Sequence, residues 1–401
     1  MELYLFWFRV LFALCSVFPI QDKVTFVDTF GDNCRFVYEE LRRRDTGKRA
    51  VFLTASRRTM GAEIPGALAM PFTARKPWHL VRGVYHLATS RFVIVDNYYG
   101  FLAAVRFRPG VECIQLWHAA GALKTFGLRD ESVKHRTARA KRRFRRVYSQ
   151  FHKLVVGSDA MAWQFEQAFG LPAERMLRTG VPRTDKFFDA GHREQVVARL
   201  RRENPALVGR KVILYAPTFR DGELNSFRLH LDIAGLRRGL GEEYALILRL
   251  HPAMKSRIPD LDAYKGFAFD YSDYPDVSDL LFLADYLITD YSSIPYEYAL
   301  LGRPMIFYPY DLSTYTRHRG LWTDYEAAVP GPVVFSTADI VRVIREDAFD
   351  RQRVQQFAAM WNQYSQGQSS KNLLDYLLAD GESYAAPAAV HSDTLGVGQS
   401  M

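Results

Sequence analysis

Short apolar runs alternate with amphipathic stretches along most of the chain, and they fall into two series. The first series has apolar runs at 23–30, 51–55, 92–95, 114–117 and 154–156, each followed by polar residues or glycine. Buried strands that alternate with helical stretches are typical of βαβ units, in which the strands lie parallel in one sheet. The pattern therefore predicts an α/β unit in the first half of the chain.

The alternation restarts after a stretch of mixed charge around 191–210. The strand candidates of this second series are 212–215, 245–250, 267–269, 286–289, 305–307 and 333–334. A mostly helical stretch at 341–378 follows them. The fold class that accounts for the pattern is α/β, with two Rossmann-like domains facing a cleft. We expect four parts: an apolar N-terminal segment (1–22), a first domain (23–195), a second domain (205–382) and a disordered tail (383–401).

The N-terminal segment is rich in aromatic residues. Residues 3–20 are apolar except for Arg9 and Ser16. A cleaved secretory signal starts with basic residues and ends in small ones, whereas Glu2 precedes this run and Phe-Pro-Ile-Gln ends it. The run is barely long enough to span a bilayer, and Arg9 near its middle would cost about 2.5–3.5 kcal/mol there. The pattern favours a helix at a membrane surface, with a helix packed on the protein's own core as the alternative.

The composition narrows the class of partner. The chain of 401 residues suits two domains, and its 53 Lys and Arg against 44 Asp and Glu favour anionic partners such as nucleic acid, anionic lipid or phosphorylated substrates. The three cysteines are scattered, which predicts neither a disulfide framework nor a zinc site and favours a reducing cytoplasmic setting. The sequence has no Walker loop and no His-Glu-x-x-His helix, and its Asp residues near the motifs are not grouped as an Asp-x-Asp clamp, so we expect no metal and no cofactor.

A dense basic cluster occupies 134–153, with nine lysines and arginines. Aromatic residues at helical spacing interrupt it, so the pattern predicts a basic amphipathic helix that binds an anionic membrane surface. The predicted membrane-binding residues are Arg142, Arg143, Arg145 and Arg146. A solvated helix face is the default alternative. Nucleic acid is not expected, because the chain lacks an RNA-binding signature, zinc spacing and base-stacking motifs.

Residues suited to phosphate or hydroxyl chemistry follow several predicted strands. His118, Thr218 and His251 each come after a strand, and Asp290, Ser292 and Ser293 follow the strand at 286–289. Ligands of such sheets sit at the carboxyl ends of the strands. We expect Ser292 and Ser293 to begin a helix, whose N-terminus suits a phosphate. The alternative is that Asp290 and the two serines only cap that helix.

Each of the other candidates has a chemical role and a structural alternative. His118 can accept a proton from a hydroxyl at neutral pH, or bond the loop backbone. His251 can stabilise charge on a leaving group, or merely end a strand. Arg319 can bind phosphate oxygens, or lie at the surface beside Arg317. Thr218 and Arg220 are expected to contact the substrate.

Five sequence blocks extend this picture. They are Trp-His-Ala-Ala-Gly-Ala-Leu-Lys at 117–124, Gly-Val-Pro-Arg-Thr-Asp at 180–185, Leu-Tyr-Ala-Pro-Thr-Phe-Arg-Asp at 214–221, Arg-Leu-His-Pro at 249–252, and the run from 285 to 332. In this order they resemble the CDP-glycerol glycerophosphotransferases, which prime and polymerise teichoic acid. Ala119 and Ala120 depart from the pattern, because the family has glycine and a hydroxyl residue there.

The resemblance implies a GT-B fold and a transfer of glycerol phosphate from CDP-glycerol to a lipid-linked acceptor, with release of CMP. It implies that His118 is the base. His251, Ser292, Ser293 and Arg319 would hold the diphosphate without a metal. The chain length is nearer that of the primase, whose acceptor is an undecaprenyl-diphosphate-linked ManNAc-GlcNAc disaccharide. We therefore expect a peripheral enzyme at the cytoplasmic face of the cell membrane of a Gram-positive bacterium.

Several alternatives remain open at this point. A poly(glycerol phosphate) polymerase or a ribitol-phosphate transferase carries the same motifs. An ordinary GT-B glycosyltransferase would move a sugar from a nucleotide sugar, and a non-catalytic binding module would need only the basic helix. A homo-oligomer is also open.

Overall fold

The computed structural model describes residues 2–54, 64–220, 229–250 and 260–379, and the chain forms two compact units. Unit 1 comprises Met1–Ala120, Phe126–Asp185 and Trp361–Met401, and unit 2 comprises Gly121–Thr125 and Lys186–Met360. The chain therefore passes between the units four times. The contiguous spans expected from the sequence, 23–195 and 205–382, differ from this division mainly because the C-terminal part returns to unit 1.

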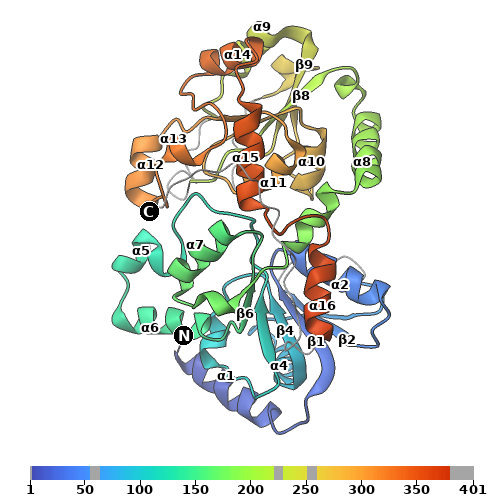
Figure 1. Cartoon of the computed structure of the whole chain (residues 1–401), viewed down its shortest axis with the longest axis vertical. Coiled ribbons are helices and arrows are strands. Elements are labelled where there is room, and N and C mark those ends of the chain that lie inside the picture. The colour runs from blue at the N-terminus through green and yellow to red at the C-terminus, as the bar shows by residue number, and fades with distance from the viewer. Residues whose placement is uncertain (1, 55–63, 221–228, 251–259, 380–401) are drawn as a thin grey trace. The chain divides into compact units, whose positions relative to one another are not determined.

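Unit 1 is built on a parallel sheet with the strand order β3-β2-β1-β4-β5-β6-β7 in the described residues. Figure 1 labels β1, β2, β4 and β6 of this sheet. The strands are β1 (Gln21–Asp28), β2 (Arg49–Thr54), β3 (Leu68–Pro71), β4 (Ser90–Val95), β5 (Glu112–Gln115), β6 (Lys153–Val155) and β7 (Met176–Leu177). Its helices are α1 (Glu2–Cys15), α2 (Asp32–Arg43), α4 (Pro77–Thr89), α5 (Glu131–Lys134), α6 (Ala138–Tyr148), α7 (Asp159–Phe169) and α16 (Ser369–Leu378).

Helix α16 completes the core of unit 1, although it lies at the far end of the described chain. Its Leu373, Leu374 and Leu377 are fully buried in one apolar cluster with Phe26 of β1 and Val37 of α2. Two backbone N–H groups at the start of α16, those of Ser369 and Ser370, donate to the carboxylate of Asp185 at 2.8 Å each. These contacts explain why the last described residues belong to unit 1.

Unit 2 is built on a second parallel sheet, with the order β10-β9-β8-β11-β12 in the described residues. Its strands are β8 (Lys211–Tyr215), β9 (Tyr244–Leu248), β10 (Ala268–Asp270), β11 (Tyr286–Thr289) and β12 (Met305–Phe307). Its helices are α8 (Ala190–Glu203), α9 (Ile233–Leu240), α10 (Val277–Leu283), α11 (Ile294–Tyr298), α12 (Leu312–Arg319), α13 (Tyr325–Ala328), α14 (Thr337–Arg345) and α15 (Arg351–Trp361). The fully buried strand β9 and the half-buried edge strand β10 fit a sheet covered on both faces.

These two parallel sheets confirm the α/β class predicted from the alternating pattern. Some predicted elements were wrong in detail. The run at 333–334 is not a strand and pairs with Phe307 through one isolated bridge at Val333. The basic stretch at 134–153 is not one helix, because Thr137 caps a new helix, α6, after the short α5. The fifth strand ends at Gln115 rather than at Trp117.

Helix α1 combines features of both alternatives considered for the N-terminus. Its Leu5, Phe8, Phe12 and Cys15 are buried, and the ring of Phe8 stacks on that of Phe101 at 5.1 Å. The other face stays open, since Leu3 and Trp7 are 71% and 60% exposed. In the described part of the chain, no helix has the length and apolar character needed to cross a membrane.

Candidate functional site

The topology of each sheet marks one position where a ligand is expected. The strand order reverses between β1 and β4 in unit 1 and between β8 and β11 in unit 2. In open parallel sheets, ligands bind outside the carboxyl ends of the strands at this switch point. In unit 2, the loops that follow β8 and β11 carry Thr218 and Asp290, and the Thr218 backbone N–H donates to Asp290 Oδ1 at 2.7 Å. The structure thus brings these two predicted substrate-binding residues together.

A buried ion network lies beneath this position. Arg220 is 8% exposed and Asp290 is 1% exposed, and Arg220 Nη1 donates to Asp290 Oδ2 at 2.8 Å. The Nε and Nη2 groups of Arg220 each donate to Asp311 at 2.9 Å. Burial acts to lower the pKa of Arg220, but the carboxylates of Asp311 and Asp290 outweigh it and raise the pKa above the ordinary value. These bonds engage Arg220 inside the protein, so in this structure it positions the two loops.

Tyrosine rings enclose the Arg220 guanidinium. Its Cζ atom lies 4.9 Å from the ring centroids of Tyr291 and Tyr315 and 5.0 Å from that of Tyr310. The rings of Tyr291 and Tyr315 stack in parallel at 3.7 Å. Cation–π contacts gain strength when desolvated, so the rings hold the guanidinium in one orientation. Because burial raises the pKa of Tyr291 and Tyr315, both phenols stay neutral at physiological pH.

The two predicted serines lie just before helix α11 rather than in it. The helix begins at Ile294, Ser293 is its N-cap residue without a side-chain cap bond, and Ser292 Oγ accepts from the Ile294 N–H at 3.2 Å. Asp290 does not cap the helix either, because its carboxylate bonds Thr218, Tyr291 and Arg220. Both serines are half-buried, so their hydroxyls can reach a ligand at the switch point.

Thr218 has a side chain that the protein leaves unsatisfied. Its Oγ1 atom is inaccessible to water and has no hydrogen-bond partner among the described residues. Buried hydroxyls normally have a partner, so such an atom at a ligand position needs an explanation. A bound ligand that accepts a hydrogen bond would provide one. The contact of Thr218 with the substrate stays a prediction.

Arg319 is the last residue of α12, and the chain around it pairs with a segment from far earlier in the sequence. The Thr125 hydroxyl donates to the Arg319 carbonyl at 3.1 Å, and Lys124 forms an antiparallel bridge with Leu321. This pairing explains why Gly121–Thr125 belongs to unit 2. It fixes the backbone of Arg319, whose side chain is half-buried. His251, which was also predicted to bind phosphate, lies outside the described residues.

The switch point of unit 1 is filled by the protein itself. The Asp96 carboxylate, which follows β4, accepts from the backbone N–H groups of Thr29, Phe30 and Gly31 at 3.0, 2.8 and 3.3 Å. It also accepts from the Tyr99 hydroxyl at 2.6 Å. Successive N–H groups at this turn are what a phosphate would use in a dinucleotide-binding unit. In this structure Asp96 occupies these groups in unit 1.

His118 follows β5 in unit 1, and an unusual backbone conformation presents it. Trp117 has a φ angle of 57°, in the left-handed region that bulky residues rarely adopt. The Trp117 N–H donates to Gln115 Oε1 at 2.8 Å, and Asn33 Nδ2 donates to the Trp117 carbonyl at 3.0 Å. The His118 ring stacks on that of Trp117 at a centroid distance of 4.4 Å and is tilted against that of Phe30 at 4.6 Å. Strained residues held in this way cluster at functional sites.

The hydrogen bond of His118 defines its protonation. Nδ1 lies 3.3 Å from the Asp96 carbonyl oxygen. That oxygen can only accept, so Nδ1 carries the proton and Nε2 keeps a lone pair. Burial, with a smaller effect of Arg183 in the same direction, lowers the pKa of His118 to about 4 against the hydrogen bond to Asp96. The ring is therefore neutral at pH 7, and its Nε2 atom can accept a proton.

The predicted membrane-binding arginines all lie on α6 of unit 1. Arg142, Arg145 and Arg146 are exposed and Arg143 is half-buried. None of these residues approaches a carboxylate within the described chain, except Arg143, which is 4.0 Å from Glu2. Among the residues that the structure describes, no three His, Cys, Asp or Glu side chains converge so that they could hold a metal ion.

Sequence reasoning missed several residues that support the site of their own unit. In unit 2, Arg220 is enclosed by Asp311, Tyr315 and Tyr291. In unit 1, the loop of His118 is supported by Asn33 and Asp96. Asp96 carried a sequence signal, because it directly follows an apolar strand as the other candidates do, and Tyr291, Asp311 and Tyr315 lie in the sequence block at 285–332 without having been assigned a role. Their roles could not be predicted, because they depend on contacts between segments that are distant along the chain.

The chain is similar to known proteins along nearly its whole length. It matches the family described as CDP-Glycerol:Poly(glycerophosphate) glycerophosphotransferase over residues 13–379. The teichoic acid glycerol-phosphate primase of Bacillus spizizenii is 36% identical over 375 residues, which cover 93% of this chain and 97% of that protein. The primase of the same name from Bacillus subtilis is 35% identical over 358 residues, covering 89% and 92%.

A solved structure has the same fold. A variant of the wall teichoic acid polymerase TagF superposes with a TM-score of 0.79 at 24% identity, covering 93% of this chain and 92% of that chain. The two Rossmann-like units and this likeness define an α/β protein of the GT-B class. The chain belongs to the CDP-glycerol:poly(glycerophosphate) glycerophosphotransferase family, as the sequence blocks predicted.

Proposed function

We propose that this protein transfers glycerol phosphate from CDP-glycerol to a hydroxyl of a lipid-linked acceptor, as a teichoic acid primase. The acceptor oxygen forms a bond to the β-phosphorus, the bond from that phosphorus to the CMP oxygen breaks, and CMP leaves. The acceptor's proton passes to His118 Nε2. Catalysis of this kind depends mainly on positioning and on stabilising the charge of the phosphoryl group.

The observation that carries the proposal is the state of His118. Its ring is neutral, its Nδ1–H is directed to the Asp96 carbonyl, and its Nε2 atom is the basic position. A general base needs this form at the pH of the reaction. Family membership supplies the reaction class, and the geometry supplies a residue able to start it.

The donor is assigned to unit 2. The half-buried Ser292 and Ser293 and the unsatisfied hydroxyl of Thr218 lie at the switch point, where a diphosphate would accept their hydrogen bonds. Arg319 and His251 complete the proposed diphosphate site. Asp290 and Arg220, predicted as direct contacts, act in this proposal by holding the two loops, since each has its partners within the protein.

The acceptor is assigned to unit 1, which carries His118 and the basic helix α6. An undecaprenyl-diphosphate-linked ManNAc-GlcNAc disaccharide fits an enzyme that works at the cytoplasmic face of the membrane as a peripheral protein. The similarity to two primases over 97% and 92% of their lengths supports a primase over a polymerase. A poly(glycerol phosphate) polymerase and a ribitol-phosphate transferase are the alternatives within the family.

The experiment is to measure CMP release from CDP-glycerol in the presence of the lipid-linked disaccharide and to determine the mass of the product by mass spectrometry. One added glycerol phosphate supports the primase, whereas a ladder of products would make the protein a polymerase. CMP release from CDP-ribitol but not from CDP-glycerol would change the assigned donor to CDP-ribitol. If both CDP-polyols are inert and a nucleotide sugar is consumed, the proposal fails in favour of a glycosyltransferase.

A second measurement tests the base. His118→Ala should lose orders of magnitude in turnover while it still binds CDP-glycerol, because the residue belongs to unit 1 and the donor site to unit 2. Turnover near that of the unmodified protein would remove His118 from the mechanism.

A further inference from the structure

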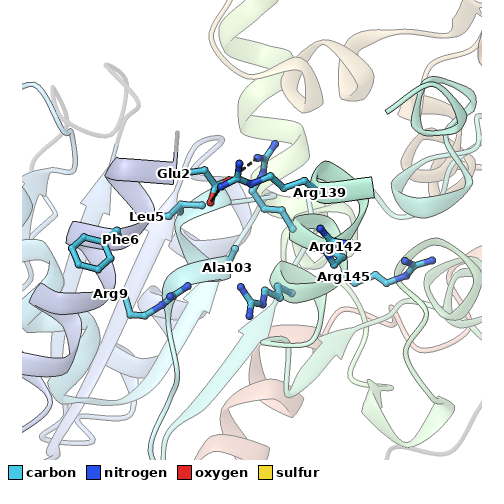
Figure 2. Close-up of a pocket in the computed structure, with 10 residues that line it drawn as sticks. Glu2, Leu5, Phe6, Arg9, Ala103, Arg139, Arg142 and Arg145 are labelled. Atoms are coloured by element: carbon cyan, nitrogen blue, oxygen red, sulfur yellow. Dashed lines mark ion pairs between the residues drawn. The ribbon is translucent and has the colours of Figure 1, made fainter. Parts of the chain in front are cut away.

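A pocket of ≈ 620 Å³ lies within unit 1 between α1 and α6. Figure 2 shows Arg9 reaching from α1 toward α6, with Ala103 between the two helices. Six arginines line the pocket: Arg9, Arg139, Arg142, Arg143, Arg145 and Arg146. Glu2 is its one acidic lining residue. The pocket therefore carries a strong excess of positive charge.

The positive charge is only partly neutralised inside the protein. Glu2 pairs with Arg139 at 3.0 Å, an ion pair that Figure 2 marks, and lies 4.0 Å from Arg143. Within the described chain, Arg9, Arg142 and Arg145 form no ion pair and no side-chain hydrogen bond. Like charges gathered around one cavity repel each other, so an anion bound there would be stabilised.

The walls of the pocket are held by packed rings. The Phe8 ring of α1 stacks on Phe101 at 5.1 Å, and Phe144 of α6 packs edge-on against Tyr98 at 5.5 Å. Phe101 belongs to the short 3-10 helix Gly100–Ala104, which carries Ala103 between the two lining helices. The arginines are therefore presented by a fixed scaffold. They are not a flexible charged tail.

The surroundings of the pocket identify the kind of anion. Leu3, Phe6 and Trp7 on the outer face of α1 are 71%, 53% and 60% exposed, and Phe6 also lines the pocket. Neighbouring apolar side chains of this size favour a non-aqueous partner. A free phosphate would use the arginines but leave these rings in water. A lipid offers both an anionic headgroup and an acyl region.

We propose that this pocket binds the phosphorylated headgroup of an anionic membrane lipid, while the outer face of α1 enters the acyl region. The inference rests on the proposed function, because it describes how the enzyme would bind to the membrane that contains its acceptor. Glu2 limits the site by occupying Arg139. The pocket thus adds Arg9, Phe6 and Glu2 to the arginines of α6 as determinants of membrane binding.

The test is cosedimentation of the full chain with phosphatidylcholine vesicles, with and without phosphatidylglycerol. Arg142→Gln/Arg145→Gln should weaken binding to the anionic vesicles about thirtyfold, since each cation near such a surface contributes a factor of about five. Glu2→Gln should strengthen it about fivefold for the same reason. Phe6→Ser should weaken binding to both kinds of vesicle.

The matched control is Arg136→Gln/Lys141→Gln, which removes two positive charges from the same region outside the pocket. The proposal expects a clearly smaller loss for this control. Equal losses in the two double variants would overturn the proposal in favour of diffuse surface charge. Displacement of the protein from vesicles by free glycerol phosphate would overturn the lipid assignment in favour of a soluble ligand.

CMP release by the unmodified protein is measured in parallel, in detergent with a short-chain acceptor. Absence of CMP there would refute the proposed function and leave the vesicle comparison valid. CMP release combined with unaltered vesicle binding by Arg142→Gln/Arg145→Gln would refute the pocket alone.

Discussion

Arg220 and Asp311 form a two-pronged ion pair, in which two guanidinium nitrogens each donate to one carboxylate oxygen at 2.9 Å. Arg220 lies in the loop after β8, and Asp311 directly precedes α12. The pair therefore ties two loops of unit 2 that are far apart in sequence. With Asp290 as a third member, it holds the backbone of Thr218 at the switch point.

Loss of Arg220 should destabilise the protein strongly. Arg220→Met leaves Asp290 and Asp311 without their cation, and removing one member of a buried ion pair costs about 3–5 kcal/mol. We expect a loss of this size in the free energy of unfolding measured in urea. Arg342→Met, which breaks an exposed pair with Asp339, should change it by less than about 1 kcal/mol. Equal effects would contradict the role assigned to Arg220.

The pH dependence of turnover should report the environment of His118. Because its pKa is lowered to about 4 from an ordinary value of 6.5, the ring stays neutral well below pH 6.5. We expect kcat/KM to fall only as the pH drops through about 4, within the range where the protein is folded. An acid limb near 6.5 would show that the ring is solvated in the free enzyme.

The same pKa has a consequence for stability. The unfolded chain binds the His118 proton at about pH 6.5 and the folded chain only near 4, so stability due to this group is complete above 6.5. It should decline as the pH falls from 6.5 through 4. Comparing the unfolding free energy of His118→Gln with that of the unmodified protein over this range isolates the effect. A constant difference across the range would contradict it.

Asn33 should act on turnover through Trp117. Its amide donates to the Trp117 carbonyl at 3.0 Å, and its Oδ1 accepts from the Arg183 N–H at 2.9 Å. Asn33→Asp keeps the acceptor but loses the donor, so the strained turn before His118 loses one support. We expect kcat to fall by at least about tenfold, corresponding to 1.4 kcal/mol, with CDP-glycerol affinity unchanged. A change in affinity alone would contradict a positioning role.

Asp185 should matter for the attachment of α16. Its half-buried carboxylate accepts from two N–H groups at the start of that helix, at 2.8 Å each. Asp185→Ala should lower the free energy of unfolding by about 2 kcal/mol, the upper end for losing a helix cap. Asp189→Ala removes the exposed cap of α8 and should cost less. Hydrogen exchange in 369–378 would locate the loss, and protection equal to that of the unmodified protein would refute it.

The sequence was sufficient for most strands of both sheets, because these buried parallel strands are short apolar runs with a polar residue after them, but it missed the edge strands β3 and β7 of unit 1, which are only four and two residues long. β11 and β12 have the predicted bounds. For the same reason, Thr218 and Asp290 were expected at strand ends, and topology alone brings such ends together. His118 was also expected to follow a strand, and it follows β5.

Tertiary contacts decided what the sequence could not. Trp117 looked like the end of a strand, since aromatic residues favour strands, but Gln115 and Asn33 hold it in a left-handed turn. Ser292 and Ser293 looked like helix starts, yet α11 begins at Ile294, followed by Pro295 near its first position. The role of Arg220 depends on Asp311, and no local pattern connects residues so far apart.

The return of α16 to unit 1 determines the order in which a nascent chain can fold. A ribosome delivers β1 and α2 early, but Leu373, Leu374 and Leu377, which fill the core against them, emerge only after all of unit 2. Unit 2 has its full set of segments once Met360 has emerged. Unit 1, whose synthesis begins first, is therefore the last to complete its core. Until then its apolar core is exposed, and chaperones can bind it or it can aggregate.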